Sequence, residues 1–169
     1  MRASSKRWIY VTEGGSSDCL LLPVQTYANP DGHDIVMTEV QAADHTTHPS
    51  NYRAAAAEVV TDEWWFGFEQ EFFFTDPETG EPLGWENGTP SKPQGEYYCG
   101  VGAGNVVGRE ISDAHLHACL DLGITLTGTN AEVALGQWEY QCFGKGIKAA
   151  DDLWVSRYLL FKIAEEFGV

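Results

Sequence analysis

Residues 65–74 read WFGFEQEFFF, and this aromatic run predicts a β-strand because no Pro interrupts it. Successive side chains of a strand point to opposite faces, so Glu69 and Glu71 share one face with Gly67 and Phe73. The other face is aromatic except for one Gln. The two carboxylates lie about 7 Å apart along the strand. They therefore either meet water on an open sheet face or bind a cation.

The composition is that of a globular chain with an acidic surface. The chain has 169 residues, 43% of them hydrophobic, which suits one domain with its own core and argues against disorder. No apolar run approaches the length of a bilayer span, so an integral membrane protein is not expected. The net charge of −15 argues against nucleic acid or an anionic membrane as a partner. No apolar signal core follows the basic residues 1–7, which favours a cytoplasmic location.

The four cysteines, Cys19, Cys99, Cys119 and Cys142, lie far apart and form no CxxC pair. Cysteine pairs at short spacing are the usual sign of a structural zinc site, so such a site is not expected. We expect free, buried thiols instead, because no secretory signal points to an oxidising compartment.

Strand-like and helix-like segments are mixed along the chain, which predicts an α+β fold with a mostly antiparallel sheet and packed helices. The turn residues at 29–32, Asn-Pro-Asp-Gly, separate the first two predicted strands. A Gly- and Pro-rich stretch over 84–106 predicts a long ordered loop, and such loops tend to be functional. The predicted strands lie at 19–24, 34–40, 65–74, 124–133 and 137–143, and the predicted helices at 50–60, 111–122 and 150–167.

The last two predicted helices each have an apolar face. His115 lies on the apolar face of the predicted helix 111–122. A histidine in such a place is more often a hydrogen-bonded core residue than a metal ligand. On the second helix, large side chains recur at helical spacing, and we expect their face to be buried. This predicted stripe consists of Trp154, Tyr158, Phe161 and Ala164, widened by Leu153, Leu160 and Ile163.

Two further glutamates, Glu132 and Glu139, lie on the last pair of predicted strands, with the turn-forming Gly136 between them. Carboxylates in apolar surroundings either shift their pKa or find a cation. Three or four Glu oxygens without Cys or an obligatory His describe a site for a hard cation, Mg²⁺ or Mn²⁺. From the pattern alone, however, a solvated strand face is the more common explanation of such glutamates.

Several motifs resemble those of glutamine synthetases of the eukaryotic and bacterial type II group. Residues 65–71, WFGFEQE, resemble the family signature WFGxEQE, and residues 136–141, GQWEYQ, resemble GQWEFQ. Residues 130–133, NAEV, resemble NGEV with Ala131 in place of Gly, and residues 93–102 resemble a family loop. The resemblance covers nearly the whole chain. Further similar segments lie at 48–54, 82–85, 108–111, 143–146 and 153–159.

The resemblance implies residues of two divalent-metal sites. In the family, the second Glu of EQE and the Glu of NGEV and of GQWEF hold one ion near the amino-acid substrate, and here these are Glu71, Glu132 and Glu139. The first Glu of EQE, here Glu69, helps to hold a second ion near the nucleotide phosphates, so Glu69 is also a candidate catalytic residue. The resemblance also implies that the aromatic ring of Trp65 would lie near the adenine of a bound nucleotide. The expected metal is Mg²⁺ or Mn²⁺, with a redox metal as an alternative.

Family members are considerably longer than this chain. The resemblance therefore implies a truncated homologue that lacks the C-terminal half and part of the N-terminal domain. Residues 1–60 are expected to form a remnant of the small N-terminal β domain with its connecting helix, and residues 61–169 a truncated catalytic domain. In the family the missing half carries the phosphate-binding Arg residues, so ATP binding is doubtful and ordinary glutamine synthesis should be impaired.

Three hypotheses about function remain open at this point. The first is a metalloenzyme that holds a divalent ion through three Glu and acts on a small amine or amino acid, with a reaction changed from ATP-dependent glutamine synthesis. The second is a non-catalytic assembly or regulatory partner of itself or of a full-length synthetase. The third is a residual ATP-dependent carboxylate–amine ligase completed by another chain. We also expect a homo-oligomer.

Overall fold

The structure is a computed structural model that describes residues 18–90 and 92–169. It confirms the α+β class, and the strands of both of its sheets pair antiparallel. Each predicted strand and helix is present, with its ends shifted by a few residues at most. The elements are β1 (Cys19–Tyr27), β2 (Ile35–Ala42), α1 (Tyr52–Val59), β3 (Trp65–Phe73), α2 (Arg109–Asp121), β4 (Leu126–Ala131), β5 (Gln137–Lys145) and α3 (Gly146–Phe167).

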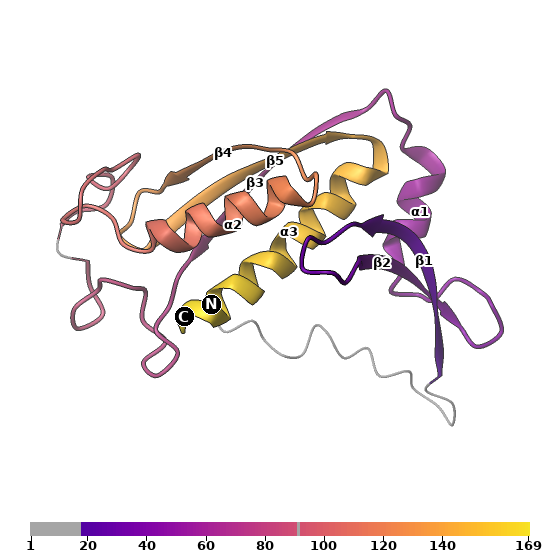
Figure 1. Cartoon of the computed structure of the whole chain (residues 1–169), viewed down its shortest axis with the longest axis horizontal. Helices are drawn as coiled ribbons and strands as arrows, with labels where there is room; N and C mark the ends of the chain where they lie inside the picture. The colour runs from indigo at the N-terminus through magenta and orange to yellow at the C-terminus, as the bar shows by residue number, and fades with distance from the viewer. Residues whose placement is uncertain (1–17, 91) are drawn as a thin grey trace.

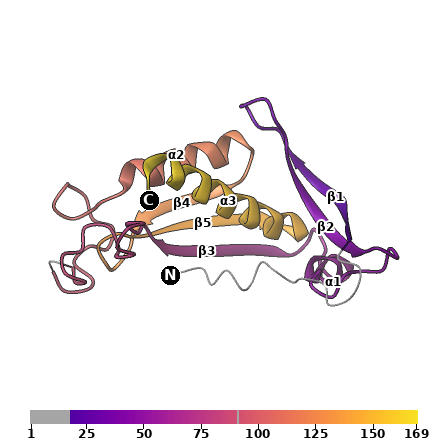
Figure 2. The ribbon, with the colours of Figure 1, turned by 90° about the horizontal axis from the view of Figure 1, so that it is seen from below.

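The larger sheet has the strand order β3-β5-β4, so β5 is its central strand. Helices α2 and α3 lie against this sheet (Figure 1). Figure 2 shows both helices on the same side of the strands. Along β3 the half-buried residues Phe68 and Phe72 pack into the core on the helix side, while Glu69 and Glu71 lie on the other face and are exposed. The alternation along β3 is the one that the sequence predicts.

The first two strands form a separate hairpin, which stands beside the larger sheet (Figure 2). It turns where the Gly32 N–H donates to the Asn29 carbonyl at 3.0 Å, within the predicted turn. Helix α1 follows, and the side chain of Asn51 caps it by accepting from the Ala54 N–H at 3.1 Å.

Polar contacts connect the hairpin and α1 to the first turns of α3. Arg53 of α1 donates through Nε and Nη2 to the two carboxylate oxygens of Asp151, each at 2.8 Å, and it also pairs with Glu39 of β2. The Tyr27 hydroxyl of β1 donates to Asp152 at 2.7 Å. Asp151 and Asp152 are each only 3% exposed. This network provides the partners without which two buried carboxylates would be costly.

The main core lies between the larger sheet and its two helices. Trp138 and Tyr140 enter it from β5, and each is 1% exposed. The predicted core role of His115 is confirmed, because His115 is buried and its Nε2 donates to the Ser156 carbonyl at 2.9 Å. The Trp138 indole N–H donates to the Val107 carbonyl at 2.8 Å, which anchors the end of the long loop between β3 and α2.

The predicted buried stripe of α3 is wrong for its three aromatic residues, but its flanking residues Leu153 and Ile163 are buried and Leu160 packs against the core. Trp154, Tyr158 and Phe161 are 46%, 54% and 67% exposed. The helix begins earlier than predicted, at Gly146, and it buries a different face. The buried face contains Asp151 and Asp152, which bind Arg53 of α1 and Tyr27 of the hairpin. It also contains smaller apolar side chains, which pack against the larger sheet. The buried residues of α3 are Gly146, Ala149, Asp151, Asp152, Leu153, Val155, Ser156, Leu159 and Ile163.

The expectation of buried thiols holds for two cysteines and is wrong for the other two. Cys119 and Cys142 are buried between α2 and β5, but Cys19 and Cys99 are exposed. Cys19 begins β1, whose first five residues are exposed, and Cys99 lies in the long loop between β3 and α2.

The predicted domain division at residue 60 stays a prediction. Of the predicted first part, residues 1–60, the structure describes only residues 18–60, and residues 1–17 lie outside the described residues. None of the helices in the described part of the chain has the length and apolar character needed to cross a membrane.

Candidate functional site

Glu71 and Glu139 lie opposite each other on neighbouring strands. The antiparallel register pairs Glu71 of β3 with Glu139 of β5, and it pairs Glu139 in turn with Asn130 of β4. Residues directly opposite on antiparallel strands project their side chains to the same face. The three side chains therefore form a row across the sheet, on the face away from α2 and α3.

Glu132 joins this row from the turn between β4 and β5. It directly follows β4, and its N–H donates to the Gln137 carbonyl at 2.9 Å. Gly136 allows the turn, because its φ is +81° and a Cβ there would lie 2.7 Å from the Leu83 carbonyl oxygen. The turn thus brings Glu132 back toward Glu139.

Amide side chains hold the three carboxylates in place. Asn130 Nδ2 lies 3.3 Å from a carboxylate oxygen of Glu132 and 3.2 Å from one of Glu139. Gln137 Nε2 donates to Glu71 at 2.9 Å. These donors are neutral, so they satisfy hydrogen-bonding capacity without cancelling the negative charge.

Glu132 and Glu139 are each 7% exposed and affect each other's protonation. Burial raises the pKa of Glu132, and the charges of Glu139 and Glu71 raise it further. Burial also acts to raise the pKa of Glu139, but hydrogen bonds with Gln141, Asn130 and Glu132 outweigh that effect and lower this pKa. The pair therefore favours a proton on Glu132 and a charge on Glu139.

No side-chain cation balances these carboxylates in the part of the chain that the structure describes. There, no Lys, Arg or His nitrogen forms an ion pair with Glu71, Glu132 or Glu139. Within residues 18–90 and 92–169, no three His, Cys, Asp or Glu side chains are already gathered to hold a metal ion. The three carboxylates are neighbours, and their side chains would have to turn toward one another to share an ion.

Glu69 lies on the same sheet face as Glu71 but lines a different hollow. In the register it is opposite Gln141 rather than a carboxylate. Glu69 thus lies two positions along β3 from the Glu71–Glu139 pair and has no carboxylate opposite it. The hollow at Glu69 is also lined by Gly67, Phe68, Thr127, Gln141, Cys142 and Phe143, and the hollow at Glu71 by Phe73, Trp85, Pro90, Gln94, Val133, Ala134 and Gln137.

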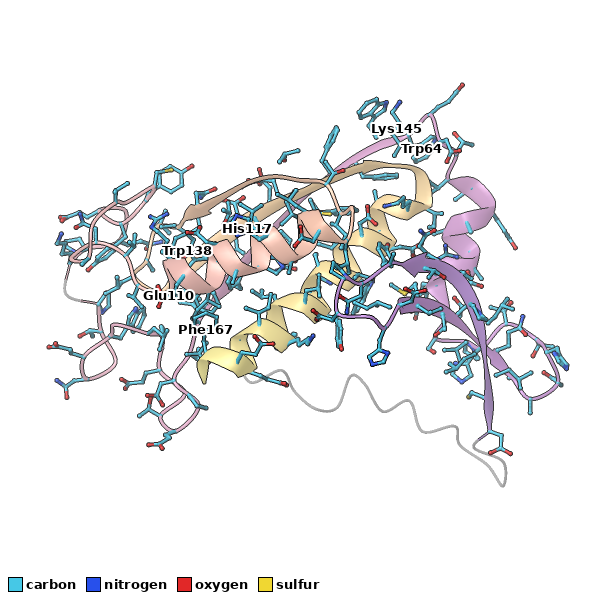
Figure 3. The ribbon with its side chains drawn as sticks, in the orientation of Figure 1. Trp64, Glu110, His117, Trp138, Lys145 and Phe167 are labelled. Carbon is cyan, nitrogen blue, oxygen red and sulfur yellow. The ribbon has the colours of Figure 1, made fainter. Side chains whose placement is uncertain are left out.

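Trp65 lies at the start of β3, beside Lys145 at the end of β5. It is 60% exposed, and Lys145 Nζ lies 4.0 Å from the centroid of its ring, which is a cation–π contact. Figure 3 shows Lys145 and Trp64 at the same end of the sheet. The suggested place of Trp65 on the adenine side of a nucleotide stays a prediction.

The sequence reasoning missed the amide residues of the site, although strand alternation was a usable signal. Gln137 and Gln141 lie two residues before and after Glu139 on β5, so all three share a face. Asn130 lies two residues before Glu132.

The reasoning also missed Tyr98, and no sequence signal could have found it. The long loop comes to the site through the Cys99 N–H, which donates to the Ala131 carbonyl at 2.9 Å. The neighbouring Cys99, and then the carboxylates of Glu132 and Glu139, raise the pKa of the Tyr98 phenol. Tyr98 therefore lies close enough to these carboxylates to sense their charge.

Comparison with known proteins gives several close relatives. Glutamine synthetase 1, mitochondrial, from Drosophila melanogaster is 49% identical over 95% of this chain and 42% of its own length. Glutamine synthetase 2 cytoplasmic from the same organism is 48% identical over 95% of this chain and 45% of its own. The glutamine synthetase of Rhizobium meliloti is 52% identical over 93% of this chain and 48% of its own.

The chain thus spans less than half the length of these relatives. Because their names include both a mitochondrial and a cytoplasmic protein, the cytoplasmic location of this chain stays a prediction. The model of the glutamine synthetase catalytic domain matches residues 50–169, which is most of the chain. This match, together with the identity to the relatives, shows that the chain belongs to the glutamine synthetase family.

Proposed function

We propose that Glu71, Glu132 and Glu139 bind one divalent metal ion, Mg²⁺ or Mn²⁺, and that the site acts on a small amine or amino acid. One observation carries the proposal: Glu132 and Glu139 are nearly buried next to each other, with neutral amides as their partners. Buried carboxylates without a cation are costly, and like charges side by side add to that cost. A divalent ion would offset both effects.

The donor set fits a hard cation. The three side chains offer only carboxylate oxygens, which Mg²⁺ and Mn²⁺ prefer over soft donors. Three carboxylates do not fill six coordination positions, so positions would remain for water or substrate. When bound, the ion would supply a Lewis acid or a template for the substrate. Asn130 and Gln137 would keep the carboxylates oriented, as partners behind metal ligands commonly do.

The hollow at Glu71 suits a small polar substrate. Trp85 provides an aromatic wall, and Gln94 and Gln137 provide amide groups that donate and accept hydrogen bonds. An ammonium group would be attracted to the uncompensated carboxylates at one side of the hollow. We propose that the reaction differs from ATP-dependent glutamine synthesis, with Glu69 in the neighbouring hollow as a candidate catalytic residue.

Calorimetric titration with Mn²⁺ tests the metal site. The wild-type protein is expected to bind one ion tightly and to release a proton, because the ligands must be deprotonated. Glu139→Gln and Glu132→Gln are each expected to lose this binding. The matched control is Glu58→Gln, since Glu58 is an exposed residue of α1 far from the row. Unchanged Mn²⁺ binding in Glu139→Gln would refute the proposal.

Assembly with another polypeptide is a second candidate function, favoured by the exposed aromatic residues Tyr158 and Phe161 of α3. Homo-oligomer formation and residual ATP-dependent ligase activity rest on the sequence alone and stay predictions. Binding of ATP, measured by calorimetry, is the minimal requirement for ligase activity.

A further inference from the structure

The sheet face that carries the proposed metal site continues along β3 and β5 as a second group of side chains. Here the antiparallel register pairs Glu69 with Gln141 and, further along, Gly67 with Phe143. Residues directly opposite each other project to the same face, and Figure 2 shows α2 and α3 on the other one. The hollow at Glu69 lies among these residues, because Gly67 has no side chain to fill it. This hollow takes no part in holding the proposed ion.

The polar side chains that line this hollow offer hydrogen-bond acceptors. Gln141 Nε2 donates to the Asn130 side chain at 3.1 Å, so the amide nitrogen faces Asn130. The Gln141 Oε1 atom lies over Gly128 instead, 2.6 Å from where a Cβ would stand. The Thr127 hydroxyl donates to the Gln141 backbone carbonyl at 3.5 Å, and its lone pairs can still accept. The third polar group is the ionisable carboxyl of Glu69, whose charged form accepts only.

Glu69 has no cationic side chain as a partner in the described residues. None of the ion pairs found there involves Glu69, and the lining of the hollow contains no Lys, Arg or His. A primary ammonium group matches such a lining, because it carries a positive charge and three donors and has no acceptor. Hydrogen bonds between ionised groups are about twice as strong as those between neutral groups. The lining therefore favours an ammonium ion over a neutral or an anionic ligand.

An aromatic wall closes the hollow at the end away from the proposed metal site. The ring of Phe143 lies beside Gly67, where a Cβ would stand 3.6 Å from Phe143 Cδ2, and its centroid is 5.3 Å from that of Trp65. Lys145 already covers Trp65, with Nζ 4.0 Å from the ring centroid. The wall therefore suits the apolar chain of a ligand. A second positive charge on the ligand would be repelled by Lys145 at this end.

We propose that the hollow at Glu69 binds a primary alkylammonium ion. The ammonium group donates to the Glu69 carboxylate and to Gln141 Oε1, and the alkyl chain lies over Gly67 against the ring of Phe143. Glu69 and Gly67 lie about 7 Å apart along β3, a distance that a short alkyl chain spans. This inference rests on the proposed function only in the choice of an amine as substrate, because binding in the hollow needs no metal ion.

An NMR titration with n-butylammonium chloride tests this site, with a chelator present so that no metal ion contributes. We expect saturable shifts that are largest for the backbone amides of Gly67 and Gly128 and for the side-chain amide of Gln141. The neutral analogue n-butanol should bind about tenfold more weakly or less, because it has no charge to pair with Glu69. The diamine analogue, butane-diammonium, should bind no more tightly than the monoamine, because its second charge approaches Lys145.

Three substitutions separate the parts of the site. Glu69→Gln should weaken binding by about tenfold, because the charge of the acceptor is lost. Phe143→Leu should weaken it by about threefold, because the aromatic wall is lost. Gly67→Val should abolish binding, since its side chain occupies the hollow, while its Cβ makes an ordinary 3.6 Å contact that the strand tolerates. The matched control, Glu58→Gln on α1, should bind as the wild type does, and circular dichroism checks that each variant folds.

The proposal is overturned if Glu69→Gln binds n-butylammonium as tightly as Glu58→Gln does. It is also overturned if the diamine binds more tightly than the monoamine and shifts signals over the whole acidic surface, which is the behaviour of a general counter-ion. Shifts that begin at the side-chain amides of Gln94 and Gln137 would overturn it as well, because the amine would then lie in the other hollow. Failure of the metal site is a separate result, since Glu139→Gln should lose Mn²⁺ but keep n-butylammonium.

Discussion

Glu71 of β3 and Glu139 of β5 occupy directly opposite positions of an antiparallel ladder, on the sheet face away from α2 and α3. Like charges at such positions repel. Glu132 adds a third carboxylate from the adjoining turn, and a backbone bend at Gly136 brings it there. A sheet does not gain stability from this arrangement in the absence of a cation. The arrangement is understandable if it serves ion binding.

Neutralising Glu132 should stabilise the metal-free protein. The pKa of this carboxyl is raised by burial and by the neighbouring charges of Glu139 and Glu71, so its charged form is disfavoured in the folded state. Glu132→Gln is expected to raise the free energy of unfolding by about 0.5 kcal/mol in the presence of a chelator. Added Mn²⁺ should stabilise the wild type but not the variant. Urea unfolding with and without Mn²⁺ measures both effects, and a destabilised metal-free variant would contradict the account.

His115 should make stability depend on pH. Burial lowers the pKa of His115 below the usual 6.5. The hydrogen bond to the Ser156 carbonyl acts to raise this pKa, but its effect is the smaller one. The unfolded chain therefore binds the proton more readily. The free energy of unfolding is therefore highest, as far as His115 is concerned, above about pH 6.5. It decreases as the pH falls below that value, by no more than about 1.4 kcal/mol per pH unit.

Urea unfolding of the wild type and of His115→Gln between pH 7.5 and 5.5 checks this. The variant is expected to be less stable at pH 7.5, because the packing and hydrogen bond are disturbed, and to show a flatter pH dependence. Parallel curves for the two proteins would count against a buried, neutral His115.

Arg53 should be essential for the attachment of the hairpin and α1 to α3. Its guanidinium group holds both oxygens of Asp151, a carboxylate with 4% of its side chain exposed. Arg53→Ala leaves that charge buried and unpaired, so we expect a loss of about 3 kcal/mol in the free energy of unfolding. Lys162→Ala is the control, because the Lys162–Asp31 pair is exposed at both ends and should contribute nothing measurable. Equal stability of the two variants would contradict the described junction.

Two of the four thiols should react quickly with a thiol reagent. Cys19 and Cys99 are exposed, whereas Cys119 and Cys142 are buried, and burial raises the pKa of Cys142 to about 11. Reactivity requires an accessible thiolate, so the buried pair should react only on unfolding. Titration with Ellman's reagent before and after adding urea counts the two classes. Cys99→Ser should remove one fast thiol, and four fast thiols in the native protein would show that the core is open.

Strand alternation is the part of the structure that could be predicted well. The faces of β3 follow directly from the period of two in WFGFEQEFF, and Gly136 signalled the turn that joins β4 to β5. The pairing of Glu71 with Glu139 could not be derived in this way, because it depends on the register between strands separated by the long loop. The position of Tyr98 depends on how that loop folds back, for which the sequence has no periodic signal.

Helix α3 illustrates where pattern reasoning fails. It carries two apolar faces, and the larger side chains, which normally indicate the buried face, lie on the exposed one. The buried face includes Asp151 and Asp152, whose partners Arg53 and Tyr27 come from elements about a hundred residues earlier in the chain. Helical periodicity cannot register such distant partners. An exposed aromatic face is nevertheless informative, because it points to a surface that another element covers.

Paramagnetic relaxation by Mn²⁺ tests the central claim most directly, because it locates the ion as well as counting it. With sub-stoichiometric Mn²⁺, we expect the side-chain amide NMR signals of Asn130 and Gln137 to broaden first, since these groups contact the three carboxylates. The signal of the Asn51 side-chain amide, at the N-cap of α1, should stay sharp. Glu139→Gln should abolish the selective broadening. Broadening that begins instead around Asp151 and Asp152, or that spreads evenly over the acidic surface, would contradict a metal site at Glu71, Glu132 and Glu139.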